Sequence, residues 1–430
     1  MRIAWFSPLA PDASKAAYAT RVLLPLLERW CEIDLYHDSL AEFEGRRVHP
    51  FLSAFSRHQH TPYDLFFYQL EDGRHSYFSR IHLGVIPGVV WFHDLLLSDY
   101  GPEPILNSAW QETVQKFRDR TRPWCAHDMK HTPKGPHAHR EAALAGIKIF
   151  SSERDHNEYR RCMETSLLPL SARSYYVPLP APAGSTAAIA EDKAASDTTR
   201  VVFCGAPRIE DRAEALLEAL LRAQQHDTTK KITLTWLIDP SERSEAEALI
   251  QESGARGVTL HEGRTPEIWQ TIVRNGDLAI HTRFSVFGQL GPYLNVSLSE
   301  GVPSVVVNFG SGELLPESLV LKISSGRAGV NELRDLITHA PSIKRAKGSD
   351  IATYGRELFD SESIARELLS VFEASAPTLK ALHARWGTFE QEAKKTLAHE
   401  AQELFENDLF GSGKLQVELL QPVYKELGWS

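Results

Sequence analysis

Two hydrophobic patterns alternate along the first part of the chain. Short apolar runs predict β-strands covered on both faces. These runs are Arg2 to Phe6, Ile33 to Tyr36, Asp64 to Gln69, Gly88 to Phe92 and Ile147 to Phe150. Leucines at helical spacing predict a helix over Ala16 to Trp30, after the loop Ser7 to Ser14. Alternating strands and helices predict parallel β-α-β units in an open, doubly wound sheet.

A second alternating set begins at Val201. The predicted strands are Val201 to Cys204, Thr233 to Ile238, Val258 to Leu260, Leu278 to His281 and Ser304 to Val307. The predicted helices are Arg212 to Gln224, Glu245 to Glu252, Thr265 to Asn275 and Pro292 to Glu300, and the chain reads as mostly helical from Asn331. The two halves therefore share one predicted architecture.

The boundary between the halves is predicted from composition. Residues 178–200 are rich in Pro, Ala, Ser, Gly and Thr, which is typical of a linker. We expect one α/β domain over 1–177, a second over 201–375, and C-terminal helices over 376–430 that cross back to the first domain. Two open sheets that face each other leave a cleft, and ligands bind at the carboxyl ends of the strands.

Composition narrows the class of protein. The 430 residues are 42% hydrophobic and 24% charged, which is ordinary for a soluble globular protein, and the length alone suggests about three domains. The net charge of −9 gives no overall basic footprint for nucleic acid. Four scattered cysteines favour a reducing compartment, and no apolar run approaches the ~20 residues of a membrane span. We therefore expect a cytoplasmic protein.

The loop after the strand Val201 to Cys204 carries candidate chemistry. Gly205 permits a tight turn, and Arg208 and Arg212 follow four residues apart at a predicted helix start. Backbone N–H groups and the helix dipole favour an anion there, so the pair suits a diphosphate group. The alternative is that Arg212 pairs with a neighbouring acid on a solvated helix face.

A second candidate is the loop Phe287 to Tyr293, which leads into a helix. Gly288, Gln289 and Gly291 lie in it, and a glycine-bearing loop at a helix N-terminus can cradle a phosphate. The alternative is a plain Gly/Pro turn.

His93, followed by Asp94, is a third candidate at the end of a buried strand. A histidine there can contact a ligand hydroxyl or transfer a proton. The alternative is a structural histidine bonded to the backbone.

Several segments, in this order, resemble the GT-B glycosyltransferases of the retaining family-4 type. They are SPLAPDASKAAYATRVLLPLL, DLFFYQLED…PGVVWFHDLLL, AGIKIFSSE, YYVPLPAP and FGQLGPYLNVSLSEGVPSVVVNFG…LVLKI, spread over about residues 1–370. The resemblance implies an N-terminal domain that binds acceptor and a C-terminal domain that binds a nucleotide diphosphate sugar. It gives phosphate contacts to Arg208, Arg212 and the Gly291 backbone, and places His93 at the sugar and its β-phosphate. It implies no required metal.

The sequence departs from that family at two places. The family's Ser-Gly after the first strand is Ser14-Lys15 here, so that Lys15 either contacts donor phosphate or acceptor, or blocks close approach. The family's acidic pair falls on Val296 and on Gly288 or Gln289. Glu300 and Glu313 lie nearby in sequence as substitutes.

Residues 101–140 form a basic, His-rich insertion. Seven Lys/Arg and two Asp lie between Lys116 and Arg140, with His127, His131, His137 and His139. A solvated loop, an anionic acceptor site, a peripheral membrane contact and a metal site all remain open for it.

Together these patterns predict a retaining glycosyltransferase with a nucleotide diphosphate sugar as donor and a glycan, lipid-linked or protein acceptor. A catalytically weak subunit that binds a sugar nucleotide or a partner, and a nucleotide-sugar epimerase, remain as alternatives. The oligomeric state is left open.

Overall fold

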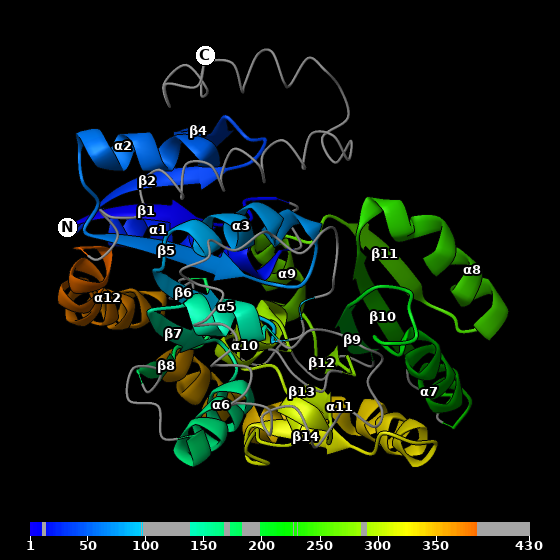
Figure 1. The fold of residues 1–430 in the computed structure, drawn as a ribbon. Coiled ribbons are helices and arrows are strands. Elements are labelled where there is room, and N and C mark those ends of the chain that lie inside the picture. Colours follow the sequence, from blue (N-terminus) through cyan, green and yellow to red (C-terminus); the bar gives the residue numbers. More distant parts are fainter. Residues whose placement is uncertain are drawn as a thin grey trace. The chain divides into compact units, whose positions relative to one another are not determined.

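The computed structural model describes residues 1–10, 14–95, 97, 138–166, 173–182, 198–226, 228–229, 231–284 and 290–384. The chain divides into two compact units (Figure 1). The first comprises Met1–Val177 and Ala365–Ser430, and the second Pro178–Ile364. The basic insertion 101–140 lies outside the described residues except for its last three positions.

The first unit is built on an eight-stranded sheet with the order β3-β4-β2-β1-β5-β6-β7-β8. Its strands are β1 (Arg2–Phe6), β2 (Glu32–His37), β3 (Glu42–Phe43), β4 (Arg46–Pro50), β5 (Leu65–Leu70), β6 (Val89–Phe92), β7 (Ile147–Phe150) and β8 (Ser174–Tyr176). Every described pair is parallel except β3 with β4. All six residues of β5 are buried, as expected of a strand with helices on both faces.

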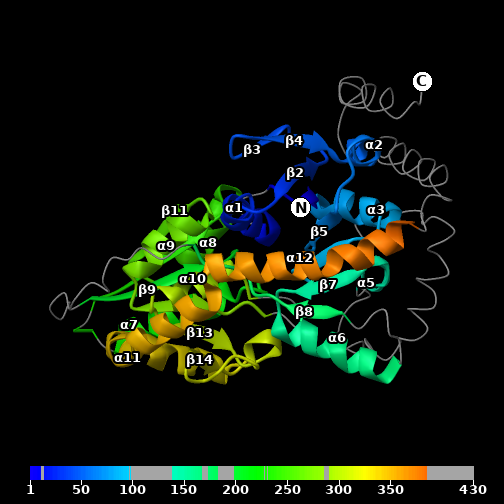
Figure 2. The same cartoon turned by 90° about the vertical axis from the view of Figure 1, so that its left-hand side faces the viewer.

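The helices of this unit come partly from the far end of the chain. They are α1 (Lys15–Leu27), α2 (Ala54–His60), α3 (Tyr77–Val85), α5 (His139–Leu144), α6 (Glu153–Ser166) and α12 (Ser361–Ala384). Figure 2 shows α12 crossing this unit. Its Phe372 is fully buried, with its ring centroid 5.0 Å from that of Phe67 and 6.5 Å from that of Trp5.

The second unit has a six-stranded parallel sheet with the order β11-β10-β9-β12-β13-β14. Its strands are β9 (Thr198–Cys204), β10 (Lys231–Ile238), β11 (Val258–Glu262), β12 (Leu278–His281), β13 (Ser304–Val307) and β14 (Val320–Ile323). Its helices are α7 (Ala213–His226), α8 (Arg243–Ser253), α9 (Pro266–Arg274), α10 (Pro292–Ser299) and α11 (Ala328–Phe359).

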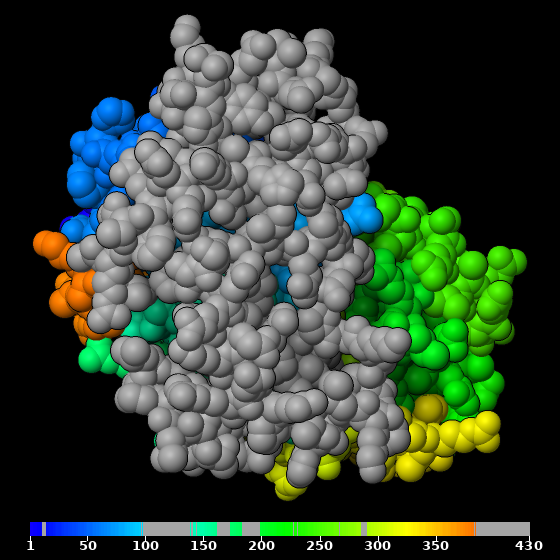
Figure 3. Space-filling model, in the orientation of Figure 1, coloured from blue at the N-terminus to red at the C-terminus, as the bar shows by residue number. Residues whose placement is uncertain are grey.

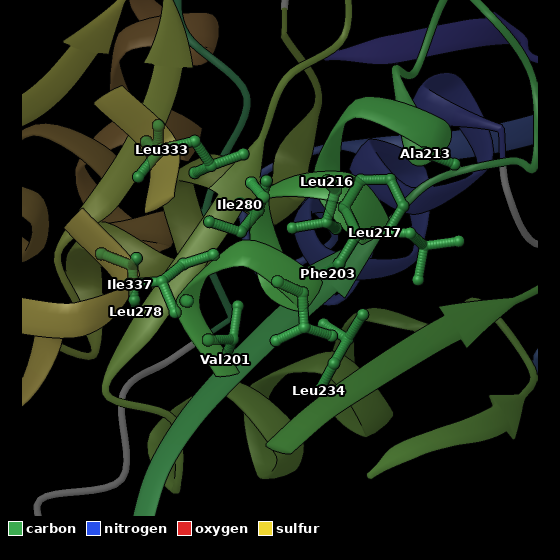
Figure 4. Packing of buried hydrophobic residues seen from close by; sticks show 14 of the residues in the cluster. Val201, Phe203, Ala213, Leu216, Leu217, Leu234, Leu278, Ile280, Leu333 and Ile337 are labelled. Atoms are coloured by element: carbon green, nitrogen blue, oxygen red, sulfur yellow. The ribbon is translucent and has the colours of Figure 1, made fainter. Parts of the chain in front are cut away.

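Alternate residues of β9 enter two separate cores. Val201 and Phe203 pack with α7 and with Leu333 and Ile337 of α11 (Figure 4). Val202, on the opposite face, joins the cluster that contains Trp269 of α9. Helices therefore cover both faces of the sheet, which explains why the inner strands β12 and β13 are buried at every residue. α8 buries a single residue, Ala246, and lies on the surface in Figure 3.

The prediction of two α/β sheets is confirmed, and four strands match residue for residue: β1, β7, β12 and β13. Sequence reasoning missed β3, β4, β8 and β14 and extended α1 to Trp30, although the helix ends at Leu27. The start of α7 was also wrong by one residue, since Arg212 precedes the helix. None of the helices in the described ranges is both long and apolar enough to cross a membrane.

The packing of α12 in the first unit can be tested by replacing Phe372. Phe372→Ala leaves a cavity against Trp5 and Phe67, and such changes destabilise a core by about 3–5 kcal/mol. We expect a lower midpoint of denaturant unfolding monitored by tryptophan fluorescence of the whole chain. Lys380→Ala, an exposed change on the same helix, is the control and should leave the midpoint unchanged. Equal midpoints for both variants would contradict the packing.

Candidate functional site

The loop after β9 is held in place by the loop after β12. The Asp211 carboxylate accepts a hydrogen bond from the Ala206 backbone N–H at 2.9 Å. The Thr282 hydroxyl donates to the Asp211 carbonyl at 3.0 Å, and the Phe284 backbone N–H donates to the Glu210 carbonyl at 2.7 Å. Gly205 allows the tight start of this loop, because a Cβ there would lie 2.5 Å from the Phe203 ring. The arginines of the loop therefore rest on a backbone with fixed anchors.

Arg208 is the exposed cation of this loop. Its side chain is 65% exposed, and its nearest partner is the Glu242 carboxylate at 3.7 Å. That carboxylate also forms a closer ion pair with Arg264 and accepts from the Asp239 backbone N–H at 3.2 Å. At the carboxyl ends of β9, β10 and β11, the guanidinium groups of Arg208 and Arg264 thus share the Glu242 carboxylate.

Sequence reasoning missed Glu242 and Arg264. The available signal was position, since Pro240–Glu242 follows β10 and Arg264 follows β11. In a parallel sheet the carboxyl ends of neighbouring strands share one edge, so charged residues in both loops could have been grouped with Arg208.

Arg212 occupies a left-handed turn rather than the first turn of the helix. Its φ is 58°, and its carbonyl accepts the Leu216 backbone N–H at 3.1 Å. Its guanidinium lies 3.4 Å from the Ser324 carbonyl after β14. The suggested pairing with Asp211 or Glu210 is not formed within the described residues. Burial lowers the pKa of Arg212, yet an arginine remains cationic.

Gly291 precedes α10 with φ 107°, a conformation that favours glycine. The Tyr293 hydroxyl donates to the Arg264 carbonyl at 3.0 Å and ties the start of α10 to the Arg264 loop. Gly288 and Gln289 lie outside the described residues. Gly291 and Arg264 are therefore brought to the same edge of the second sheet.

Glu300 and Glu313, the possible substitutes for the family's acidic pair, lie at the end of α10 and after β13. Val296, where the resembled family has an acid, is buried. Glu300 ends α10 and is held by Arg274 at 2.9 and 3.0 Å and by the Gln270 amide at 2.6 Å. Glu313 is exposed after β13, and its carbonyl accepts from the Lys322 ammonium at 2.7 Å. Glu300 is thus already paired at the helix end away from Gly291.

Cys204 is the last residue of β9 and lies near Arg264, Asp211 and Glu242. Burial raises the pKa of its thiol to about 12, so the thiol stays protonated near neutral pH. Within the described ranges, no group of three or more Cys, His, Asp or Glu side chains is arranged to hold a metal ion.

His93 lies at the carboxyl end of β6 in the first unit and is fully buried. Its Nε2 is 2.7 Å from the Gln69 Oε1, and its Nδ1 has no partner in the described part of the chain. Burial lowers the pKa of His93 to about 4, so the imidazole is neutral near pH 7.

A chain of hydrogen bonds sets the tautomer of His93. The Gln69 amide nitrogen donates to the Thr20 hydroxyl at 2.7 Å and to the Ser7 hydroxyl at 3.3 Å. The Gln69 oxygen must therefore accept the proton on His93 Nε2, which leaves Nδ1 as an acceptor. An acceptor nitrogen suits a ligand hydroxyl, whereas a phosphate oxygen would need a donor.

Lys15 belongs to a second cluster at this edge. Its ammonium pairs with the Asp94 carboxylate at 2.5 Å and its side chain is 10% exposed. The Lys15 and Ala16 backbone N–H groups donate to one oxygen of Glu71 at 2.8 and 3.2 Å. Glu71 therefore occupies the N-terminus of α1, a position that favours anions. The other Glu71 oxygen lies 2.6 Å from His75 Nε2.

The predicted site residues thus fall into two groups. His93, Asp94 and Lys15 lie at the carboxyl edge of the first sheet. Their neighbours there include Glu71 and His75, which the sequence analysis did not single out. Arg208, Arg212, Gly205 and Gly291 lie at the carboxyl edge of the second sheet. The second edge can hold an anion, and the first offers hydroxyl-binding groups.

None of the protein-family models compared with the sequence matches it, and no curated protein sequence matches it. Solved structures do match. Sucrose-phosphate synthase from Thermosynechococcus elongatus has a TM-score of 0.61 at 16% identity, over 87% of this chain and 98% of that one. HepE from Anabaena, in complex with UDP and glucose, has a TM-score of 0.56 at 15% identity, over 87% of this chain and all (100%) of that one. A glycosyltransferase from Rickettsia africae has a TM-score of 0.55 at 10% identity, over 87% and 98% of the chains.

These likenesses show the fold. The chain has the α/β architecture of two parallel-sheet domains found in GT-B glycosyltransferases, as the sequence resemblance implied. At these identities they carry nothing about the donor, the acceptor or the stereochemistry.

The stability that the Glu71–His75 pair contributes to the fold should depend on pH. Burial alone lowers the pKa of His75, but Glu71 outweighs it and raises that pKa overall. Burial alone raises the pKa of Glu71, but the bond to His75 lowers it overall. The stability that His75 contributes is lost as pH rises through its raised pKa. The stability that Glu71 contributes is lost as pH falls through its lowered pKa. The pair therefore stabilises most between the ordinary values of 4.5 and 6.5.

Glu71→Gln keeps the acceptor for the α1 backbone and removes the charge. We expect the His75 pKa, followed by NMR of the ring protons, to fall in this variant. The stability difference from wild type should be largest between pH 4.5 and 6.5 and shrink on either side. An unchanged His75 titration would contradict the ion pair.

Proposed function

We propose that this protein is a retaining glycosyltransferase that moves a hexose from a nucleotide diphosphate sugar to an acceptor hydroxyl. The observation that carries the proposal is the carboxyl edge of the second sheet, where exposed Arg208 and Arg264 share Glu242 and Gly291 precedes α10. The exposed Arg208 guanidinium can pair with a diphosphate here, in a fold shared with HepE, whose structure contains UDP and glucose.

Each group has a proposed role. Arg208 and Arg212 neutralise the diphosphate as the bond to the sugar breaks, and the backbone around Gly291 donates N–H groups to it. Arg208 lies 3.7 Å from Glu242, so donor binding competes with this contact. The arginines and the helix terminus supply the positive charge, so the proposal requires no metal ion.

His93 is proposed to receive a hydrogen bond from a sugar hydroxyl through Nδ1. This revises the contact with the β-phosphate that the sequence resemblance implied, because the neutral ring presents a lone pair at that atom. With retention of configuration, the leaving phosphate itself takes the proton of the acceptor, so no strong side-chain base is needed.

Lys15 is proposed to orient Asp94 rather than to hold donor phosphate. Its ammonium is already paired at 2.5 Å, and the neighbouring N-terminus of α1 is filled by Glu71. Asp94 is then positioned at the carboxyl edge of the first sheet, where it can accept from hydroxyls of the acceptor.

One observation favours a second candidate, a catalytically weak subunit that binds a sugar nucleotide. Buried Val296 stands where the resembled family has the acid that holds ribose, and Glu300 is engaged by Arg274 and Gln270. Such a protein would bind the donor and turn it over poorly. The proposal of peripheral membrane contact rests on residues 101–140, which lie largely outside the described ranges.

Calorimetric titration with a panel of nucleotide diphosphate sugars, beginning with UDP-glucose, tests the proposal. It is combined with detection of released nucleoside diphosphate in the presence of candidate acceptors. Binding with release supports the transferase, and binding without release supports the weak subunit. Absence of binding by wild type to every member of the panel would overturn the donor site.

Arg208→Ala tests the role of the exposed arginine. Loss of a charge-assisted contact of about 1.5–3 kcal/mol predicts affinity for UDP that is about ten- to a hundredfold weaker. Because Arg208 is exposed and paired only at 3.7 Å, the variant should unfold at the wild-type temperature. Arg256→Ala, an exposed arginine just before β11 at the opposite edge of the same sheet, is the matched control. Equal affinities for the two variants would count against the assignment.

A further inference from the structure

A cavity of about 400 Å³ lies in the first unit, away from the candidate site. It is lined by Arg2, Ser56, Arg57, His60 and Thr61. Arg2 is the first residue of β1, and Thr61 follows α2 shortly before β5 begins. The cavity is therefore at the amino edge of the sheet, whereas His93 and Lys15 lie at its carboxyl edge.

The two arginines of this cavity share one partly buried carboxylate, that of Asp34. Arg2 bonds Asp34 at 2.6 Å and Arg57 bonds it at 3.2 Å. Burial alone raises the pKa of Asp34, but bonds from Tyr63 and Arg57 lower it overall, so the carboxylate is ionised. Two further acids lie near Arg2: Glu32, which is 71% exposed, and exposed Asp64, which accepts from the Arg2 backbone N–H at 2.7 Å. Water screens the charges of both carboxylates.

Part of this charge remains available to a ligand. Arg57 is one-third exposed, at 34%, and uses Nε toward Tyr63 and Nη2 toward Asp34. Its Nη1 has no partner within the described ranges. The Ser56 hydroxyl and the exposed His60 ring likewise have no described partner. One guanidinium edge, one hydroxyl and one imidazole thus line the same space.

The local field is consistent with a positive excess. His49 lies 4.0 Å from Asp34, a distance at which a carboxylate alone would raise its pKa. Burial and then Arg57 nevertheless lower the pKa of His49 to about 4. Burial is thus the main cause of the low pKa of His49, and at this ring the effect of Arg57 is larger than that of Asp34.

The site is also held rigidly. Arg2 is 13% exposed, donates to the Thr61 carbonyl, and stacks with its guanidinium carbon 4.2 Å from the centre of the Tyr63 ring. A guanidinium fixed by several partners loses little conformational entropy when an anion binds.

We propose that this cavity binds a phosphate monoester of a small polyhydroxylated molecule, such as a sugar phosphate. Arg57 pairs with the phosphate, and Ser56 and His60 bond phosphate or hydroxyl oxygens. A volume of about 400 Å³ is larger than inorganic phosphate alone requires and lies within the range of small-molecule sites. The site is separate from the proposed donor site in residues and in unit.

The test is calorimetric titration of the full chain with glucose 6-phosphate, inorganic phosphate and glucose. The titrations use the Arg208→Ala variant with excess UDP present, so that phosphate does not bind at the second sheet. We expect glucose 6-phosphate to bind, inorganic phosphate to bind more weakly, and glucose to give no heat. Equal affinities for the two phosphates would overturn the assignment of a sugar-sized ligand.

Arg57→Gln should weaken glucose 6-phosphate at least tenfold. The matched control is Arg46→Gln, which removes another arginine of the same unit, paired with Glu28 at 2.8 Å and not lining the cavity. If Arg57→Gln fails to fold, His60→Ala replaces it, because that side chain is exposed, and a severalfold loss is expected.

No binding by wild type, or equal binding by the cavity variant and by Arg46→Gln, would overturn the proposal. A separate UDP titration of wild type reports on the donor site, so failure of one site is distinguished from failure of the other.

Discussion

The parallel arrangement of the strands is the constraint from which both candidate edges follow. In a parallel sheet the carboxyl ends of the strands and the N-termini of the following helices share one edge, where oriented backbone N–H groups meet the loops. In the second unit this edge gathers Arg208, Arg264 and Gly291 from three different loops. In the first it gathers His93, Lys15 and Glu71. The loops that follow neighbouring strands therefore bring together residues that are far apart in sequence.

The two edges use charge differently. At the first edge the charges are satisfied internally, since Glu71 fills the N-terminus of α1 and Asp94 neutralises Lys15. His93 Nε2 donates to Gln69, so Nδ1 carries no proton and can accept a hydrogen bond. At the second edge two arginines share Glu242, and Arg208 remains mostly exposed. An anion is therefore better accommodated at the second edge, and hydroxyl groups at the first.

The sequence predicted the fold well where burial is uniform. Strands such as Ile147–Phe150 and Leu278–His281 are buried throughout and mostly apolar, so their apolar runs indicated where they begin and end. Strand β4 was missed because Arg46–Pro50 is polar and lies near the sheet edge. At the site, the positions of Arg208 and His93 after strands were predictable. The Glu242–Arg264 pair and the Glu71 contact with α1 were not, because they join loops far apart in sequence.

The central claim is that the carboxyl edge of the second sheet holds a nucleoside diphosphate. Hydrogen exchange of the backbone, measured by mass spectrometry with and without saturating UDP, tests it most directly because it reports where binding occurs. We expect slower exchange in the peptides covering 204–212 and 290–294, with peptides from β3 and β4 unchanged. Unchanged exchange in both of those segments at saturating UDP, or protection confined to the first unit, would contradict it.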